Sequence, residues 1–392
     1  MSEDKQPGAN SAPGKPDGKP DGKPRTMRKA RVRARRWPAV LAGTTTAVIA
    51  AGAVAAATVL PGNPATAIVT GAPVVLPVGN TVNNCVAPTR LLTGTAVGTD
   101  PQYSPDSSSS TSTLNALLLS TPGGVLPGAS LNSLDGSGAP LETLTPSPSA
   151  TATPAAGLAK LNAVNLGATS VSADTVLNAA PVGGQRAVVS GAVVVSTPDG
   201  DLQGLAAANC QEPSNDLWLA GASTTVGRTA VLNVVNSSQT AATINLDLYG
   251  SDGPIQAAGG KGLLIPAGKS RAIVLAGLAP NQNQLSMRLK STGGPVTATI
   301  QQSVLRGLTA GGVDYLQPVE APSNGQVITG VQVQAPADAA KISGQSGYAD
   351  ATAAVEVTIP GNSDAVVEVK VFGPGGQAAL PNGEWSPPRP AP

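Results

Sequence analysis

The chain has 392 residues, of which 12% are charged and 2% are aromatic, with 46 glycines and 36 prolines. Any hydrophobic core must therefore be built from Val, Leu, Ile and Ala. The chain contains no histidine, which excludes Ser-His-Asp and Cys-His catalysis and removes the commonest metal ligand.

The N-terminal part is strongly basic and is followed by an uncharged run. Residues 1–36 hold 11 Lys/Arg against 4 Asp/Glu, and their Lys-Pro-Asp-Gly repeat predicts a disordered basic segment. No residue from Ala39 to Leu60 is charged, and 22 helical residues would measure roughly 33 Å, enough to cross a bilayer. Residues 37–61 therefore predict a transmembrane helix or uncleaved signal anchor. The basic cluster before the span predicts a cytoplasmic N-terminus.

A second interpretation is a cleaved signal peptide. Ala65-Thr66-Ala67 has the small residues that a signal peptidase recognises, which makes Ala67 a candidate cleavage position. The length of the span favours a retained anchor, and both interpretations stay open. Either one places residues from about 68 onward outside the cytoplasm.

The two cysteines, Cys85 and Cys210, both lie on the exported side of the span. In an oxidising compartment such a pair predicts a disulfide. Two cysteines without histidine do not suggest a metal site, so we expect neither a metal nor a cofactor.

Residues 68–212 predict a first β-rich domain. Its clearest run, Arg186 to Thr197, is followed by the turn sequence Pro198-Asp199-Gly200 and a returning strand. A Ser/Thr/Pro-rich low-complexity insertion, at about residues 100–157, interrupts this domain.

Residues 213–320 show the clearest β pattern. About six short alternating runs are separated by turn signals, and two of them flank the tight turn Pro266-Ala-Gly268. Such spacing predicts an immunoglobulin-like β-sandwich. The segment Gly268-Lys269-Ser270 lacks the spacing of a phosphate-binding loop, and its expected place in a hairpin between two strands favours a simple turn.

An internal repeat predicts a second sandwich over residues 321–392. Residues 367–376 align with residues 244–253 at an offset of 123, and the same offset places Val355 and Val357 on strand residues of the first copy. The chain after the repeat is shorter than in the first copy, so we expect a truncated, poorly folded unit with unpaired strand edges. The predicted fold is thus all-β, with tandem immunoglobulin-like β-sandwich domains after a disordered N-terminus and one transmembrane helix.

Few residues of the exported region suggest a site. Trp218 is one of its few large aromatic residues, and we interpret it as a core residue near the disulfide rather than a surface for stacking sugars. Glycosidase chemistry needs two carboxylates across a cleft. The acidic residues of this region fall mostly in turns, where solvation explains them: Asp135, Glu142, Asp199, Asp201, Glu212, Asp216, Asp247 and Asp252. We therefore expect no catalytic site.

Several motifs resemble the actinobacterial DUF5719 family of exported or anchored proteins of unknown activity. They are Asn209-Cys210-Gln-Glu-Pro213, Leu217-Trp218-Leu-Ala-Gly221, Leu248-Tyr249-Gly-Ser-Asp-Gly253 and Ile265-Pro-Ala-Gly-Lys-Ser270. The resemblance covers roughly residues 70–375. Leu219 replaces the second aromatic residue that usually follows the tryptophan, and the resemblance implies no catalytic residues.

These observations predict a non-enzymatic, membrane-anchored envelope protein. It would be a single-pass protein with its C-terminal region outside the cell, acting as a structural or interaction module. The alternative is a secreted protein that binds or processes envelope polysaccharide. The membrane, cell-wall glycan and envelope proteins are the expected partners. Nucleic acid is not expected, because the basic segment precedes a membrane span.

Overall fold

The computed structural model describes residues 78–91, 107–121, 124–144, 162–351, 353–361 and 363–378. Strands prevail among them, and helix is confined to α2 (Pro336–Ser343) and two short 3-10 turns, η1 (Ala258–Gly260) and η2 (Leu275–Gly277). The predicted all-β class is therefore confirmed.

The predicted N-terminal features are not part of this description. The basic segment, the span at 37–61 and the candidate cleavage position after Ala67 all lie outside the described residues. No helix among the described residues combines the length and the apolar sequence needed to cross a bilayer.

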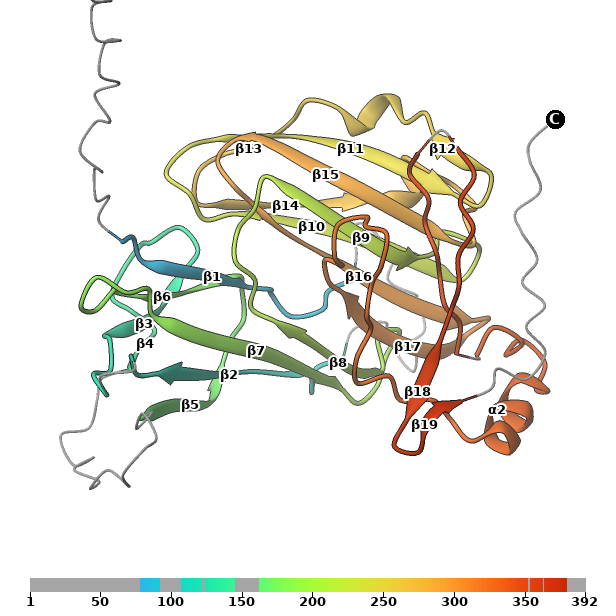
Figure 1. Ribbon diagram of the computed structural model, residues 1–392, viewed down its shortest axis with the longest axis horizontal. Coiled ribbons are helices and arrows are strands. Elements are labelled where there is room, and N and C mark those ends of the chain that lie inside the picture. Colours follow the sequence, from blue (N-terminus) through green and yellow to red (C-terminus); the bar gives the residue numbers. More distant parts are fainter. Residues whose placement is uncertain are drawn as a thin grey trace, which may run out of the picture. The chain divides into compact units, whose positions relative to one another are not determined.

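The first half of the described chain forms two antiparallel sheets that share one hydrophobic cluster (Figure 1). Sheet I has the order β1 (Thr81–Cys85), β6 (Thr175–Ala179), β3 (Ala129–Ser133), β4 (Glu142–Leu144). Sheet II has the order β5 (Ala163–Ser170), β2 (Thr111–Leu119), β7 (Val188–Thr197), β8 (Gly204–Asn209). Buried and exposed residues alternate along β7, as expected for a strand with one face on a core. We call these two sheets the first β body.

Strand β2 lies inside the segment expected to be a low-complexity insertion. Thr111 begins a nine-residue strand that pairs with β5 on one side and β7 on the other. Leu114 and Leu118 are fully buried in the cluster, because alternate residues of the run Thr-Ser-Thr-Leu-Asn-Ala-Leu-Leu-Leu face the core. The Ser/Thr-rich residues just before this run led to the prediction of an insertion, although the run forms an inner strand of sheet II.

The second half, which we call the second β body, also pairs two sheets over one cluster. Sheet III has the order β14 (Lys269–Val274), β10 (Arg228–Asn236), β16 (Thr297–Arg306), β17 (Thr309–Leu316). Sheet IV has the order β12 (Gly253–Ile255), β11 (Ala242–Gly250), β15 (Leu285–Gly293), β9 (Asp216–Ala222), with β13 (Leu263–Ile265) also paired to β11. The buried residues that the strands of sheet III contribute to this cluster are alanines and branched aliphatic residues, and the cluster contains no aromatic residue.

The turn Pro266-Ala-Gly268 does not close a hairpin, which corrects the sequence prediction. Strand β13 before it pairs with β11 in sheet IV, whereas β14 after it pairs with β10 in sheet III. The turn therefore carries the chain across the core from one sheet to the other. Gly268 has a φ of 63°, a left-handed conformation that favours glycine at this corner.

Asn236 organises the same crossing and is fully buried. Its side-chain amide nitrogen donates to the carbonyl oxygens of Thr240 at 2.8 Å and Ile265 at 3.1 Å. Its amide oxygen accepts from the backbone nitrogen of Ser238 at 3.0 Å. One side chain thus ties together the two connections that cross between the sheets.

The two β bodies meet through an apolar contact, in which Val313 and Tyr315 of β17 join the buried cluster of the first body, and also through a polar seam. The outer face of β16 presents Thr297, Thr299 and Gln301, which are all buried. Thr297 accepts from Asn84 at 3.2 Å, and Gln301 exchanges hydrogen bonds of 2.9 and 2.8 Å with the backbone of Arg90. Buried polar groups of this kind are costly unless they are paired. Because the pairs form only when the two bodies are correctly aligned, the seam favours one relative position of the bodies.

A disulfide joins Cys85 at the end of β1 to Cys210 just after β8, as the sequence predicts. It links sheet I to sheet II, and Cys85 is fully buried. Gly191 on β7 makes room for it, because a Cβ at that position would lie 2.8 Å from the Cys210 sulfur.

The C-terminal segment differs from the predicted second sandwich. The described residues after Leu316 form α2 and one hairpin of β18 (Val371–Gly373) and β19 (Gly376–Ala378). Val355 and Val357 are exposed, whereas the aligned residues of β10 are buried. The segment contacts β15, where the Ser286 hydroxyl donates to Glu356 at 2.7 Å. Among the described residues, the repeat-like residues pair only within this hairpin and add no strand to sheets I to IV.

Candidate functional site

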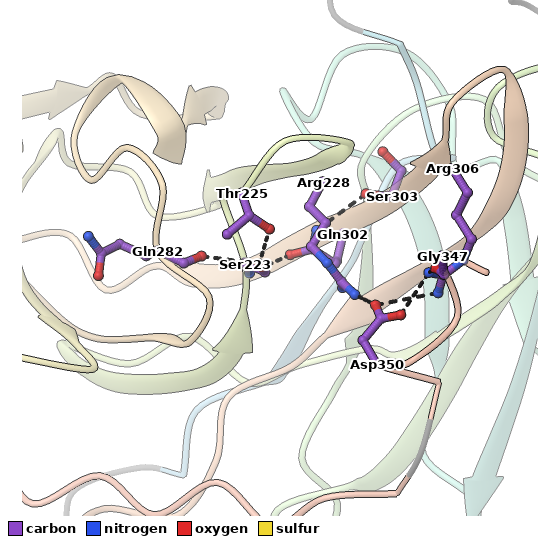
Figure 2. Close-up of polar contacts among 9 residues, drawn as sticks. All are labelled: Ser223, Thr225, Arg228, Gln282, Gln302, Ser303, Arg306, Gly347 and Asp350. Carbon is purple, nitrogen blue, oxygen red and sulfur yellow. Dashed lines mark hydrogen bonds and ion pairs between the residues drawn. The ribbon is translucent and has the colours of Figure 1, made fainter. Parts of the chain in front are cut away.

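A pair of arginines at one end of sheet III forms a polar cluster with neighbouring residues (Figure 2). Arg228 begins β10 and Arg306 ends β16, the strand beside it. The backbone nitrogen of Leu305 donates to Gly227 at 2.7 Å, which closes the ladder at this end. Gly227 has a φ of 78°, so the approach of the two strands requires glycine just before Arg228.

Both guanidinium groups converge on the carboxylate of Asp350, which comes from the C-terminal segment. Arg306 donates to one oxygen at 2.7 Å and to the other at 3.4 Å. Arg228 forms an ion pair with the same carboxylate. Arg306 also donates to the carbonyl oxygen of Gly347, and its guanidinium lies 4.3 Å from the ring centre of Tyr348.

The arginine pair is largely removed from solvent. The side chains of Arg306 and Arg228 are 16% and 23% exposed, against 37% for Asp350. Burial, together with the neighbouring charge of Arg306, lowers the pKa of Arg228 below its usual value. Both effects disfavour the cation, so this end of the sheet favours a bound anion.

A row of uncharged side chains supports the loop that leads to Arg228 (Figure 2). The backbone nitrogen of Ser223 donates to the Gln302 side chain at 2.8 Å, and the Ser223 hydroxyl donates to the Gln282 carbonyl at 3.1 Å. Gln302 in turn donates to the carbonyl of Thr229 at 3.2 Å. These bonds fix the backbone on both sides of Arg228, which keeps the two guanidinium groups together.

Trp218 is a buried residue of the second β body. Its side chain is 8% exposed, and its ring stacks on Tyr249 with 5.8 Å between ring centres. The guanidinium of Arg288 lies 5.5 Å from the Trp218 ring and is paired with Asp216. The cluster that contains Cys85 does not include Trp218. The ring is therefore buried, but it belongs to neither of the two hydrophobic clusters.

The acidic residues weighed for glycosidase chemistry are dispersed, and several are held in ion pairs. Asp216 pairs with Arg288, which by hydrogen bonding lowers the pKa of that carboxyl. Asp247 pairs with Lys261, and Glu212 pairs with Arg186 at 2.6 Å. Hydrogen bonds from Ser137 and Ser133 lower the pKa of the exposed Asp135 to about 2. Within the described ranges, no three His, Cys, Asp or Glu side chains are grouped so as to hold a metal ion.

A shallow hollow of about 300 Å³ lies on the outer face of sheet II. Its polar lining is uncharged and consists of Asn115, Asn165, Asn209 and Ser190. The amide oxygen of Asn115 accepts from the backbone nitrogen of Ala168 at 2.9 Å, beside an irregularity in the pairing of β2 with β5. Amide side chains around an open hollow offer hydrogen bonds to a neutral hydroxylated ligand.

These features define a disulfide-linked all-β protein with an arginine-based polar cluster. A family model described as a family of unknown function, DUF5719, matches residues 166–386, and the chain belongs to this family. The match begins in β5 and so does not extend over β1 and β2, which the resemblance was expected to include. No curated protein and no solved structure matches the chain.

The sequence motifs located part of what the structure brings together. Cys85 and Cys210 meet, and Trp218 contacts Tyr249 from another of the quoted motifs. The motifs did not locate Arg228, Arg306 or Asp350. The sequence did contain one indication of this site. The charge-poor region 213–350 has four arginines, and two of them lie at the ends of alternating runs typical of strands.

Proposed function

We propose that this protein is a non-enzymatic, membrane-anchored envelope protein whose two β bodies act outside the cell as an interaction module. The observation that carries the proposal is the Cys85–Cys210 disulfide, since such bonds persist in oxidising compartments. The uncharged run at 39–60, preceded by basic residues, supplies the anchor in this proposal.

We also infer that each body is a β-sandwich, in the sense that two sheets enclose one buried cluster. The expected immunoglobulin-like strand order has weaker support. In that order the first two strands, A and B, share one sheet, whereas here β9 lies in sheet IV beside β15 and β10 lies in sheet III between β14 and β16. The sandwich supports a binding role because it holds loops and sheet faces rigidly.

The anchoring and the export are tested together on the protein isolated from its native cells. We expect the protein in the membrane fraction, with peptides from residues 1–36 present and with both cysteines blocked to alkylation until reduction. A mature N-terminus at Ile68 would instead identify a released protein. Cysteines that react without reduction would contradict export itself.

A second candidate function is binding of neutral envelope polysaccharide at the hollow on sheet II, which its uncharged amide lining favours. We expect a glycan array probed with the full chain to give reproducible sugar binding. Replacing Asn165 and Asn209 by alanine should weaken it about 30-fold, since each lost hydrogen bond costs about 1 kcal/mol. The control Asn132→Ala, on sheet I, should leave it unchanged. Binding that survives the double substitution would exclude the hollow.

A further inference from the structure

The contact between the arginine pair and Asp350 resembles an anion-binding site in which a residue of the chain itself takes the place of the ligand. Two cations that are more than three-quarters buried stand next to each other, which is unfavourable without an anion between them. The anion present is supplied by a residue 44 positions after Arg306 along the chain. Neither arginine has another ion-pair partner among the described residues.

The carboxylate leaves part of the donor capacity of the site unused. A guanidinium group presents five N–H donors, whereas a carboxylate offers two oxygens; Oδ2 of Asp350 is shared by the two arginines and Oδ1 accepts from Arg306. The Nε of Arg306 is buried and has no acceptor among the described residues. An anion with three or four oxygens would satisfy more of these donors than Asp350 does.

Asp350 is also easily displaced, because its segment has few other attachments. Residues 344–347 and Asp350 itself are exposed, and no strand of sheets I to IV pairs with this segment. Beyond Asp350, the side-chain bonds to the β bodies are those of Ser286 with Glu356 and Thr358, within the described ranges. The two arginines, in contrast, are held in place by their strands and by the hydrogen bond between Ser223 and Gln302.

We propose that Arg228 and Arg306 form a binding site for a phosphoryl group, which Asp350 occupies in the absence of ligand. A phosphoryl group on an external molecule would replace the Asp350 carboxylate between the two guanidinium groups. Because both anions use the same donors, binding of one releases the other, and the segment around Asp350 separates from sheet III. This inference does not depend on where the protein is located.

The first test measures phosphate binding by titration calorimetry on the full chain at constant ionic strength. Asp350→Asn removes the competing charge and keeps the shape of the side chain, so phosphate should bind about tenfold more tightly than to the unaltered chain. Adding Arg228→Gln and Arg306→Gln to this variant should abolish the binding. The matched control Arg271→Gln, on the exposed strand β14, should have no effect. Equal affinities in the unaltered chain and Asp350→Asn would refute the proposal.

The nature of the anion is tested with three probes on the Asp350→Asn chain. Inorganic phosphate binding more tightly than dimethyl phosphate would assign a terminal phosphate, and the reverse order would assign a phosphodiester within a polymer. Acetate should bind more weakly than both. Acetate binding as tightly as phosphate would overturn the phosphoryl assignment.

A second measurement uses the unaltered chain and does not rely on any substitution being tolerated. Hydrogen exchange of the peptide covering residues 344–351 should become several-fold faster in sodium phosphate than in sodium chloride of equal ionic strength. Exchange in β11, which lies in the other sheet, should be the same in both salts. Identical exchange of residues 344–351 in the two salts would show that Asp350 is a fixed structural contact.

Discussion

Replacing both Cys85 and Cys210 by alanine is expected to lower the free energy of unfolding of the first β body by about 5 kcal/mol. The bond closes a sequence separation of 125 residues, and the loss of loop entropy in the unfolded chain predicts this size of effect. Urea denaturation followed by far-UV circular dichroism measures it. Reducing the unaltered protein should reproduce most of the loss.

The same experiment reports whether the polar seam couples the two bodies. Fluorescence of Trp218 reports on the second body, once Trp37 and Trp385 are replaced by phenylalanine. If the seam couples the bodies, the fluorescence midpoint should fall together with the circular dichroism midpoint when the disulfide is removed. A double variant that loses less than about 1 kcal/mol would contradict the assigned role of the disulfide.

Asn236→Ala is expected to lower the free energy of unfolding of the second body by about 3 kcal/mol. The change removes the buried amide that donates to the carbonyls of Thr240 and Ile265, and it removes the acceptor of the Ser238 backbone nitrogen. Buried groups that lose a partner cost about 1–3 kcal/mol. Urea denaturation followed by Trp218 fluorescence measures the change.

Two further variants make this prediction specific. Asn233 lies on the same strand, is partly exposed and makes no side-chain hydrogen bond among the described residues, so Asn233→Ala should cost less than about 0.5 kcal/mol. Asn236→Asp keeps the acceptor but turns the donor into a second acceptor facing two carbonyls, so it should destabilise at least as much as alanine. Equal, small effects at both asparagines would show that Asn236 is not needed for the crossing.

Much of the strand pattern could be predicted from local sequence. The run Ala242–Gly250 alternates between apolar and polar residues, and β11 has those bounds because one face is buried and the other is not. The turn Pro198-Asp199-Gly200 likewise separates β7 from β8. These elements depend on residues close together in the chain, which a single sequence displays.

The pairing of the strands could not be predicted in the same way. Strands β13 and β14 look like a hairpin, but whether a turn closes a ladder or crosses a core depends on partners elsewhere in the chain, here β11 and β10. Thr297, Thr299 and Gln301 look like a solvent face, because alternation shows only that they are opposite to the core. Their burial depends on the first body.

The candidate site was hidden for a related reason. Arg228, Arg306 and Asp350 are spread over more than a hundred residues, and each appears in the sequence as an isolated charge. Strand register brings the two arginines together, and the C-terminal segment, which adds no strand to sheet III, brings the aspartate. A lone charge is usually solvated, so only their spatial convergence indicates a site.

The position of the disulfide also determines how the chain would carry mechanical load. Tension applied at the N-terminal side enters the β1 strand, reaches Cys85 and passes directly through the covalent bond to Cys210, six residues before β9. The 125-residue separation between the cysteines, roughly 430 Å of extended chain, is thereby excluded from the path of the force. A pull between the two ends of this protein would stretch the second body while leaving most of the first unloaded.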